Sequence, residues 1–291
     1  MSKNLKKIAP LLLMLVTLWA CSLTTQAAAY YKNLLSQSSK ASTFSAYDIT
    51  NDGKADTITI TPTKAGYSYN RIKVFINGKS ALNWSTKAPI YSWSVQYLHL
   101  TNSREYLYIH GHGDSNMPYL QCIYAYNSSN GQLAKVYDFS SEYFSKSATT
   151  IDKVTSKSFR IVCACQPSLV GYVKFSLTYK VSGSTFKRST SKATVKSTLT
   201  YDAGDGYTKY FKKSQFKLVS KTNLLKSAGS SKKAFTAPAG AVLTMKKITV
   251  KNNIFYIQFK YKGKTGWLKN YGNIFNTFYG VSRRLAGGFY G

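Results

Sequence analysis

Apolar and polar residues alternate with a period of two along much of this 291-residue chain. The alternation is clear in residues 71–76, 92–97 and 105–110. Successive side chains of a β-strand point to opposite faces, so this pattern predicts strands. No long stretch shows a 3.6-residue period, although residues 30–40 could form a short helix. The sequence therefore predicts an all-β fold.

Three turn glycines recur at nearly equal intervals. Gly78, Gly131 and Gly183 each lie between two predicted strands, and Asn77-Gly78 is a strong hairpin signal. The intervals are 53 residues (78 to 131) and 52 residues (131 to 183). Such spacing predicts a repeated sheet of the size of a propeller blade. Because three or four blades are too few for an ordinary closed propeller, we expect an open propeller-like stack or a sandwich. Coincidence among 19 glycines is the alternative.

The N-terminus has the three parts of a secretory signal. Basic residues precede the apolar run 8–20, and Ala27 and Ala29 fit a small-residue cleavage site. We therefore expect a secreted protein whose mature chain begins near Tyr30, after a signal peptide of residues 1–29. The segment Leu18-Trp19-Ala20-Cys21 also resembles a bacterial lipobox, in which Cys21 would be lipidated. Trp19 departs from the small residue usual at its position, so a lipoprotein anchor is the alternative.

Basic residues outnumber acidic ones by 40 to 10, a formal net charge of +30. Such a charge favours a polyanionic partner, and export removes nucleic acid as the preferred one. We expect peptidoglycan or teichoic acid of a Gram-positive wall, or another anionic surface polymer or phospholipid. An aromatic content of 15% argues against disorder, and no long apolar span follows the N-terminus. Compositional bias alone remains an alternative source of the lysines.

Residues 48–56 hold three of the ten acidic residues. Calcium takes six to eight oxygen ligands, mostly from alternate positions of a tight loop. The side chains of Asp48, Thr50, Asp52 and Asp56 and the backbone carbonyl of Lys54 could supply oxygens. The segment predicts at most one calcium site. A network of Asx turns without metal is the alternative.

This loop and the strand after it resemble the D-x-D-x-D-G-x-x-D-x-I motif of FG-GAP/VCBS repeats. The resemblance implies a β-rich, propeller-like domain of the integrin-α type, with calcium in the loop. Thr50 stands where the family has Asp or Asn, which implies a weaker metal site. Later in the chain, residues 98–105 keep the hydrophobic frame and lose the acids.

Residues 224–269 contain five short predicted strands, which could close into a small barrel. Their ending, Gly263-Lys264-Thr265-Gly266-Trp267-Leu268, resembles the G-K-x-G-W-[VIL] ending of bacterial SH3-like (SH3b) domains. The resemblance implies an exported binding module directed to wall components. Tyr256 and Trp267 could line its ligand groove, since aromatic faces suit sugar and peptide contacts. A core position for Trp267 is the alternative.

The cysteines and histidines give only weak indications of a metal site or a disulfide. Cys122, Cys163 and Cys165 of the mature chain are expected to be small buried side chains, and a disulfide from Cys122 is an alternative. His110 and His112 would share a strand face, and Asp114 could complete a metal site with them. The intervening glycines favour instead a strand running out into a loop.

These patterns predict four segments: a signal peptide (1–29), an FG-GAP/VCBS-like domain (30–218), an SH3b-like barrel (219–272) and an aromatic, glycine-rich tail (273–291). The predicted function is a non-enzymatic exported binding protein of the cell wall or cell surface. One alternative is a cell-wall hydrolase or accessory factor, whose Cys–His couple would combine one of the three thiols with His110 or His112. The other is a basic protein that binds host glycans or membranes.

Overall fold

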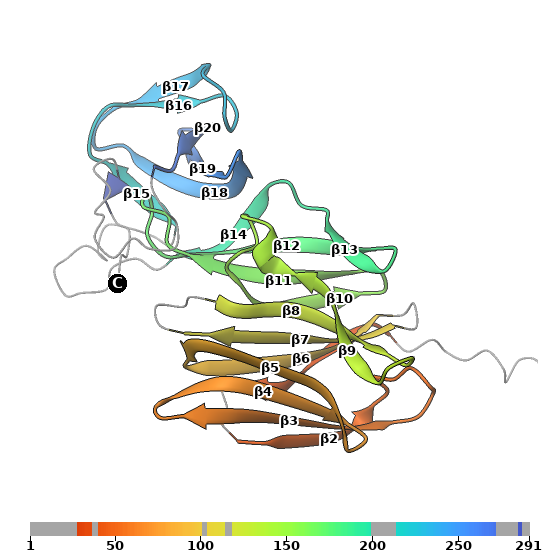
Figure 1. The fold of residues 1–291 in the computed structure, drawn as a ribbon. Helices are drawn as coiled ribbons and strands as arrows, with labels where there is room; N and C mark the ends of the chain where they lie inside the picture. Colours follow the sequence, from red (N-terminus) through yellow and green to blue (C-terminus); the bar gives the residue numbers. More distant parts are fainter. Residues whose placement is uncertain are drawn as a thin grey trace, which may run out of the picture.

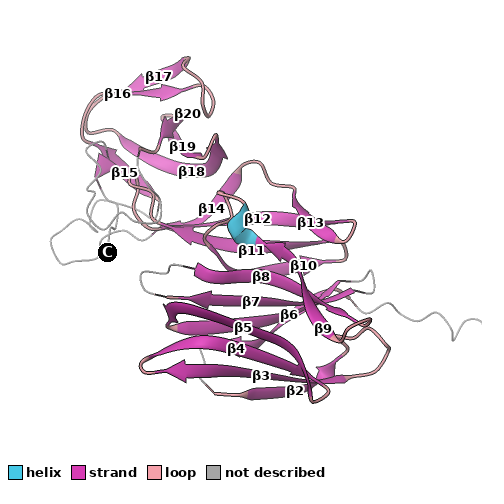
Figure 2. Ribbon diagram, in the orientation of Figure 1, coloured by secondary structure: helices cyan, strands magenta, loops and turns pink. Residues whose placement is uncertain are grey.

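The computed structural model describes residues 28–36, 40–100, 104–113, 118–198, 214–271 and 285–286. Residues 1–27 of the predicted signal peptide, Cys21 and Asp114 lie outside these residues. The described part is built from strands, which confirms the all-β prediction (Figures 1 and 2). Its helical residues form one short 3-10 turn, Phe139–Ser141. Among the described residues we find no helix with the length and apolar character needed to cross a membrane.

Three antiparallel sheets follow one another along the chain. The first sheet consists of β2 (Ser42–Tyr47), β3 (Asp56–Ala65), β4 (Ser68–Ile76) and β5 (Lys79–Ile90). The second contains β6 (Ser92–Leu100), β7 (Arg104–His112), β8 (Pro118–Asn127) and β9 (Gln132–Asp138), with β1 (Tyr30–Ser36) paired to β6. The third contains β10 (Ala148–Thr155), β11 (Ser158–Cys165), β12 (Val173–Ser182), β13 (Thr185–Arg188) and β14 (Ala193–Thr198). The expected helix over residues 30–40 is wrong, because β1 pairs with β6 from Tyr30 to Ser36.

The regular glycines mark equivalent turns of the three sheets. Gly78 joins β4 to β5, Gly131 joins β8 to β9, and Gly183 joins β12 to β13. Each is the turn between the third and fourth strands of its meander. All three have positive φ values, of 76°, 70° and 62°, which glycine adopts without steric cost. The spacing therefore reflects a repeated four-strand meander.

The second sheet is buried on both faces because the other two sheets cover it. One hydrophobic cluster joins it to the first sheet through residues such as Trp93, Val95 and Ile109. Another joins its opposite face to the third sheet through Tyr108, Ile123 and their neighbours. Figure 1 shows the three sheets as successive layers. The alternation along β7 thus divides its side chains between two cores.

The C-terminal unit, residues 214–271, adds strands to the third sheet. It contains β15 (Gln215–Leu218), β16 (Thr222–Leu225), β17 (Lys233–Ala237), β18 (Val242–Lys251), β19 (Ile254–Tyr261) and β20 (Lys264–Lys269). One edge of β18 pairs with both β15 and β14. The strands of the C-terminal unit therefore form one continuous sheet with the strands of the third sheet. Beyond this unit, β21 (Leu285–Ala286) pairs with β15, so part of the predicted tail packs back.

The expected closed barrel is not formed by the described strands. The described pairings run from β15 through β18, β19, β20 and β16 to β17 without a pairing between β17 and β15. The hairpin of β16 and β17 reaches β20 through one paired position, Leu225 with Trp267. Because β18 also pairs with β14, the unit is an open extension of the third sheet.

Candidate functional site

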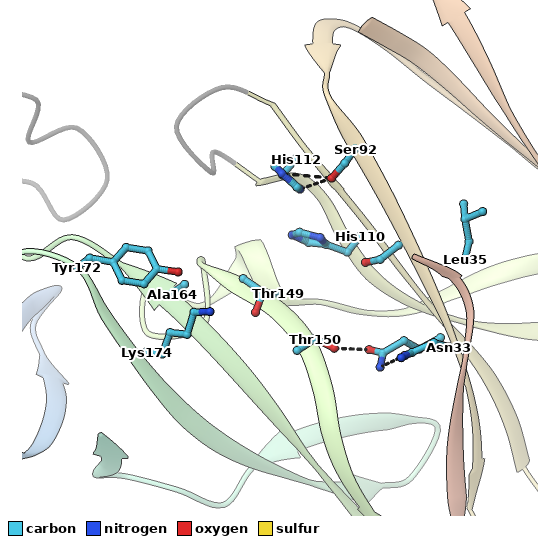
Figure 3. A pocket seen from close by; sticks show the side chains of 12 residues that line it. Asn33, Leu35, Ser92, His110, His112, Thr149, Thr150, Ala164, Tyr172 and Lys174 are labelled. Carbon is cyan, nitrogen blue, oxygen red and sulfur yellow. Dashed lines mark hydrogen bonds between the residues drawn. The ribbon is translucent and has the colours of Figure 1, made fainter. Parts of the chain in front are cut away.

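A cavity of about 290 Å³ with a mixed polar and apolar lining lies between the second and third sheets. Its walls come from β1, β6 and β7 on one side and from β10, β11 and β12 on the other (Figure 3). The side chains of β7 that face the third sheet are Tyr106, Tyr108 and then His110, following the period of two. Tyr106 and Tyr108 pack in the aromatic core, and His110 lies at the border between that core and the cavity.

His110 and His112 lie on the same strand, as the alternative interpretation of the sequence predicted. Strand β7 extends to His112 and does not run out at Gly111, which pairs with Trp93. A Cβ atom at position 111 would lie 2.4 Å from the Trp93 ring, so the small residue makes room for this aromatic side chain. The two glycine-flanked imidazoles therefore belong to the sheet, with ring centroids 5.6 Å apart.

The two imidazoles differ in their partners. His112 Nδ1 lies 2.8 Å from the hydroxyl of Ser92. His110 is only 7% exposed and makes no hydrogen bond to any described residue, and its ring faces the cavity in Figure 3. Burial, reinforced by the nearby His112, lowers the pKa of His110 to about 3. His110 is therefore neutral at physiological pH and offers one donor and one acceptor.

Gln96 lines the cavity and connects the two sheets. Its side chain is 2% exposed. The amide nitrogen donates to the Ile151 carbonyl (2.9 Å) and to Asn33 Oδ1 (2.8 Å). The amide oxygen accepts from the Ile151 N–H (2.7 Å) and from the Thr150 hydroxyl (3.2 Å). Four hydrogen bonds from one side chain thus join β1, β6 and β10 and fix this wall.

The wall opposite His110 carries Tyr172 and Lys174. Figure 3 shows the Tyr172 hydroxyl and the Lys174 amine directed toward the space that His110 faces. The Lys174 Nζ also lies 5.8 Å from the centroid of the Tyr172 ring. No carboxylate lines the cavity among the described residues. Lysine is thus the one fully charged residue type in a lining of hydroxyls, amides and imidazoles.

Sequence reasoning found His110 and His112 and missed the other residues of this site. Gln96, Tyr172 and Lys174 lie in ordinary alternating strands or beside them. They meet only because the second and third sheets stack, which no local pattern records. Gly111 was the available signal, since a glycine within a buried strand marks a close approach.

The acidic loop of residues 48–56 connects β2 to β3, and its carboxylates hold its own backbone. Asp48 accepts from the backbone N–H groups of Asp52 (3.0 Å) and Gly53 (2.8 Å). Asp52 accepts from the N–H of Lys54 at 2.9 Å. The buried Asp56 accepts from the Thr50 N–H (2.8 Å) and from Asn77 Nδ2 (2.6 Å).

These hydrogen bonds form an Asx-turn network, and they do not test calcium binding. Within the described residues, no group of three or more His, Cys, Asp or Glu side chains is placed to hold a metal ion. The carboxylates of Asp48, Asp52 and Asp56 accept hydrogen bonds from backbone and amide donors. Calcium binding by these residues, with Thr50 and Lys54, stays a prediction.

The two aromatic residues assigned to a ligand groove are buried. Trp267 is 3% exposed and Tyr256 is 7% exposed. The Lys192 Nζ also lies 5.8 Å from the centroid of the Trp267 ring. These positions favour the core interpretation of Trp267. A ligand-binding role for the pair stays a prediction, since neither ring presents an open face in this structure.

The three described cysteines are buried free thiols. Burial raises the pKa of the Cys122 thiol to about 12 and raises the pKa values of Cys163 and Cys165 as well. A thiol must ionise to act as a nucleophile, so these environments do not activate it. They agree with the expectation of small buried side chains.

The C-terminal unit presents a lysine-rich surface. Residues 214–271 contain twelve lysines and neither Asp nor Glu. Eleven of the twelve are exposed, and Lys269 is partly exposed. None takes part in the ion pairs of the described residues. Three of these lysines, Lys260, Lys262 and Lys264, lie together in the β19–β20 hairpin.

No known family model, curated protein or solved structure matches the chain. The resemblances to SH3b domains and to FG-GAP/VCBS repeats therefore stay predictions.

Proposed function

We propose that the protein is an exported, non-enzymatic binding protein that associates with an anionic polymer of the bacterial cell wall. Its C-terminal unit, which resembles an SH3b domain, would make the contact. Peptidoglycan carrying teichoic acid is the partner that this charge and this resemblance favour. The N-terminal sheets, which resemble FG-GAP/VCBS repeats, would form the other part of this surface protein.

The observation that carries the proposal is the acid-free lysine surface of residues 214–271. Exposed ammonium groups without acidic neighbours produce a positive potential over the whole unit. Each such group near an anionic surface contributes about 1 kcal/mol at moderate ionic strength. Several lysines together can therefore hold a protein on a polyanion without a shaped pocket. Binding of this kind weakens as salt screens the charges.

The alternative of a wall hydrolase receives less support from the same structure. The three thiols considered for its Cys–His couple are buried, and burial raises the pKa of each. A turbidity assay on purified walls, comparing wild type with Cys→Ser variants at Cys122, Cys163 and Cys165, tests this alternative. Clearing of the walls by wild type and its loss in one variant would replace the binding proposal.

Sedimentation with purified Gram-positive walls tests the proposal. The mature protein should pellet with walls at low salt and elute as ionic strength rises. The triple variant K260Q/K262Q/K264Q should bind at least about 10-fold more weakly, because three adjacent charges are lost. The control K64Q/K79Q/K87Q removes three exposed lysines from the first sheet and should bind like wild type.

The outcomes separate the possible partners. Walls stripped of teichoic acid should bind less protein if the polymer is the ligand. Equal losses in the two triple variants would mean that net charge alone drives binding, against a role for the C-terminal unit. Protein that stays in the supernatant at low salt, or that binds anionic lipid vesicles in place of walls, would refute the wall proposal.

A further inference from the structure

The cavity between the second and third sheets is bordered by a nearly buried polar side chain whose ring nitrogens are open to the cavity. His110 is 93% buried, taking its 7% exposure, and its imidazole makes no hydrogen bond to any described residue. Buried polar groups in folded proteins nearly always have a partner, because leaving one unmade costs free energy. A molecule in the cavity would supply that partner.

The lining restricts the chemistry of such a molecule. Hydroxyl groups of Ser94, Thr149 and Tyr172 surround the space, and each can both donate and accept a hydrogen bond. The neutral imidazole of His110 has the same dual capacity. Groups of this kind match a ligand with several hydroxyls, which also donate and accept. An apolar ligand would offer His110 no hydrogen-bond partner.

The charge of the lining sets the charge of the ligand. Lys174 brings an ammonium group to the cavity from β12, and no described lining residue is a carboxylate. A cation would meet only repulsion there, whereas an anionic group next to Lys174 would gain a charge-assisted hydrogen bond. The volume of about 290 Å³ is at the lower limit of ordinary ligand pockets, which suits one sugar ring.

We propose that this cavity binds an acidic sugar unit, with the ring hydroxyls bonded to His110 and the surrounding hydroxyls and with its carboxylate at Lys174. Gln96 holds the two walls at the required separation through its four hydrogen bonds. The site is separate from the lysine surface of the C-terminal unit. It stands whether or not that surface binds cell walls.

Nuclear magnetic resonance of the histidine ring nitrogens in the mature protein provides the test. The probes are D-glucuronate, D-galacturonate, N-acetylmuramate and N-acetylneuraminate, with D-glucose and sodium acetate as controls. At least one acidic sugar should shift the His110 ring signals, with a Kd of about 1 mM or lower. Glucose and acetate, which each carry half of the required chemistry, should bind at least about 10-fold more weakly.

Variants assign the two contacts. Lys174→Gln changes an exposed side chain and should weaken the acidic sugar about 10-fold while leaving glucose unaffected. Lys180→Gln is the matched control, because Lys180 is an exposed lysine on the same strand that does not line the cavity. His110→Phe should abolish sugar binding, and near-ultraviolet circular dichroism reports whether that variant keeps its packed core.

Three results would overturn the proposal. The first is that none of the four acidic sugars shifts the His110 signals. The second is that acetate binds as tightly as the sugars, which would make the cavity a site for small anions only. The third is that Lys174→Gln and Lys180→Gln weaken binding equally. If His110→Phe fails to fold, the comparison of Lys174→Gln with Lys180→Gln still tests whether the cavity binds the acidic sugar.

Discussion

His110 should make the protein less stable as the pH falls below neutrality. The imidazole has a pKa of about 6.5 in an unfolded chain. Burial first, and the positive field of His112 second, lower the pKa of His110 to about 3 in the folded protein. Between these two values the unfolded chain binds a proton that the folded chain does not. Stability is therefore fully present above pH 6.5 and decreases as the pH drops toward 3.

The size of the effect follows from the two pKa values. At pH 4.5 the folded imidazole is still neutral, and the unfolded one lies two pH units below its pKa. Each unit corresponds to about 1.4 kcal/mol, so folding at pH 4.5 loses about 2.7 kcal/mol through this one group. Between pH 7 and pH 4.5 the change is about 2.5 kcal/mol, a large part of the 5–15 kcal/mol that is typical of folded proteins.

Urea denaturation of wild type and His110→Gln at pH 7 and pH 4.5 isolates this contribution. Gln keeps a polar side chain and cannot ionise. All other titrating groups are common to both proteins, so the difference between the two pH dependences belongs to position 110 and its interaction with His112. Wild type should lose about 2.5 kcal/mol more than the variant on acidification. Parallel pH dependences would show that the folded imidazole ionises normally, which would refute its desolvation in the cavity.

Three further predictions follow from other contacts. Gln96→Leu should cost about 2–4 kcal/mol in urea denaturation at pH 7, because it leaves a buried N–H and C=O of β10 unpaired. Gln132→Leu, which removes an exposed bridge between sheets, should cost less than about 0.5 kcal/mol. Gly266→Ala should cost about 1–3 kcal/mol in the same assay, since its Cβ would lie 2.6 Å from that of Leu224. Calorimetry should detect calcium binding to wild type and none to Asp52→Ala.

Each of these has an outcome that contradicts it. Equal effects of the Gln96 and Gln132 substitutions would mean that the buried hydrogen bonds of Gln96 stabilise the protein no more than an exposed one does. A Gly266→Ala variant as stable as wild type would show that the chain relieves the contact at no cost. An absence of calcium heat in wild type would leave the loop around Asp52 as a purely internal hydrogen-bond network.

Local patterns determine the strands, and the sequence therefore predicted them well. Asn77-Gly78 fixes a hairpin because the turn requires positive φ, whatever surrounds it. The same holds for Gly131 and Gly183, whose spacing indicated the repeated meander. Gly266 in the C-terminal motif also has a local steric reason, the close approach of Leu224.

Contacts between sheets could not be predicted in the same way. The cavity depends on Gln96 meeting Ile151 and on Lys174 facing His110 across two sheets. The spacing of residues within one strand does not predict contacts between residues of different sheets. The expected barrel failed for a related reason, since β18 uses one edge to join β14 of the third sheet. Trp267 belongs to a motif that is compatible with exposure or burial, and only packing decides between them.

The pairing of β1 with β6 also limits the order in which the sheets of an emerging chain can form. Tyr30 pairs with His99, so the complete first sheet is made between the two partner strands. Chain growth from the N-terminus lets β2 to β5 pair as neighbours while β1 still has no partner. The backbone groups of β1 and its apolar Leu34 and Leu35 then stay available until β6 emerges. A factor that holds this segment in the growing chain would delay the second sheet and leave the first free to form.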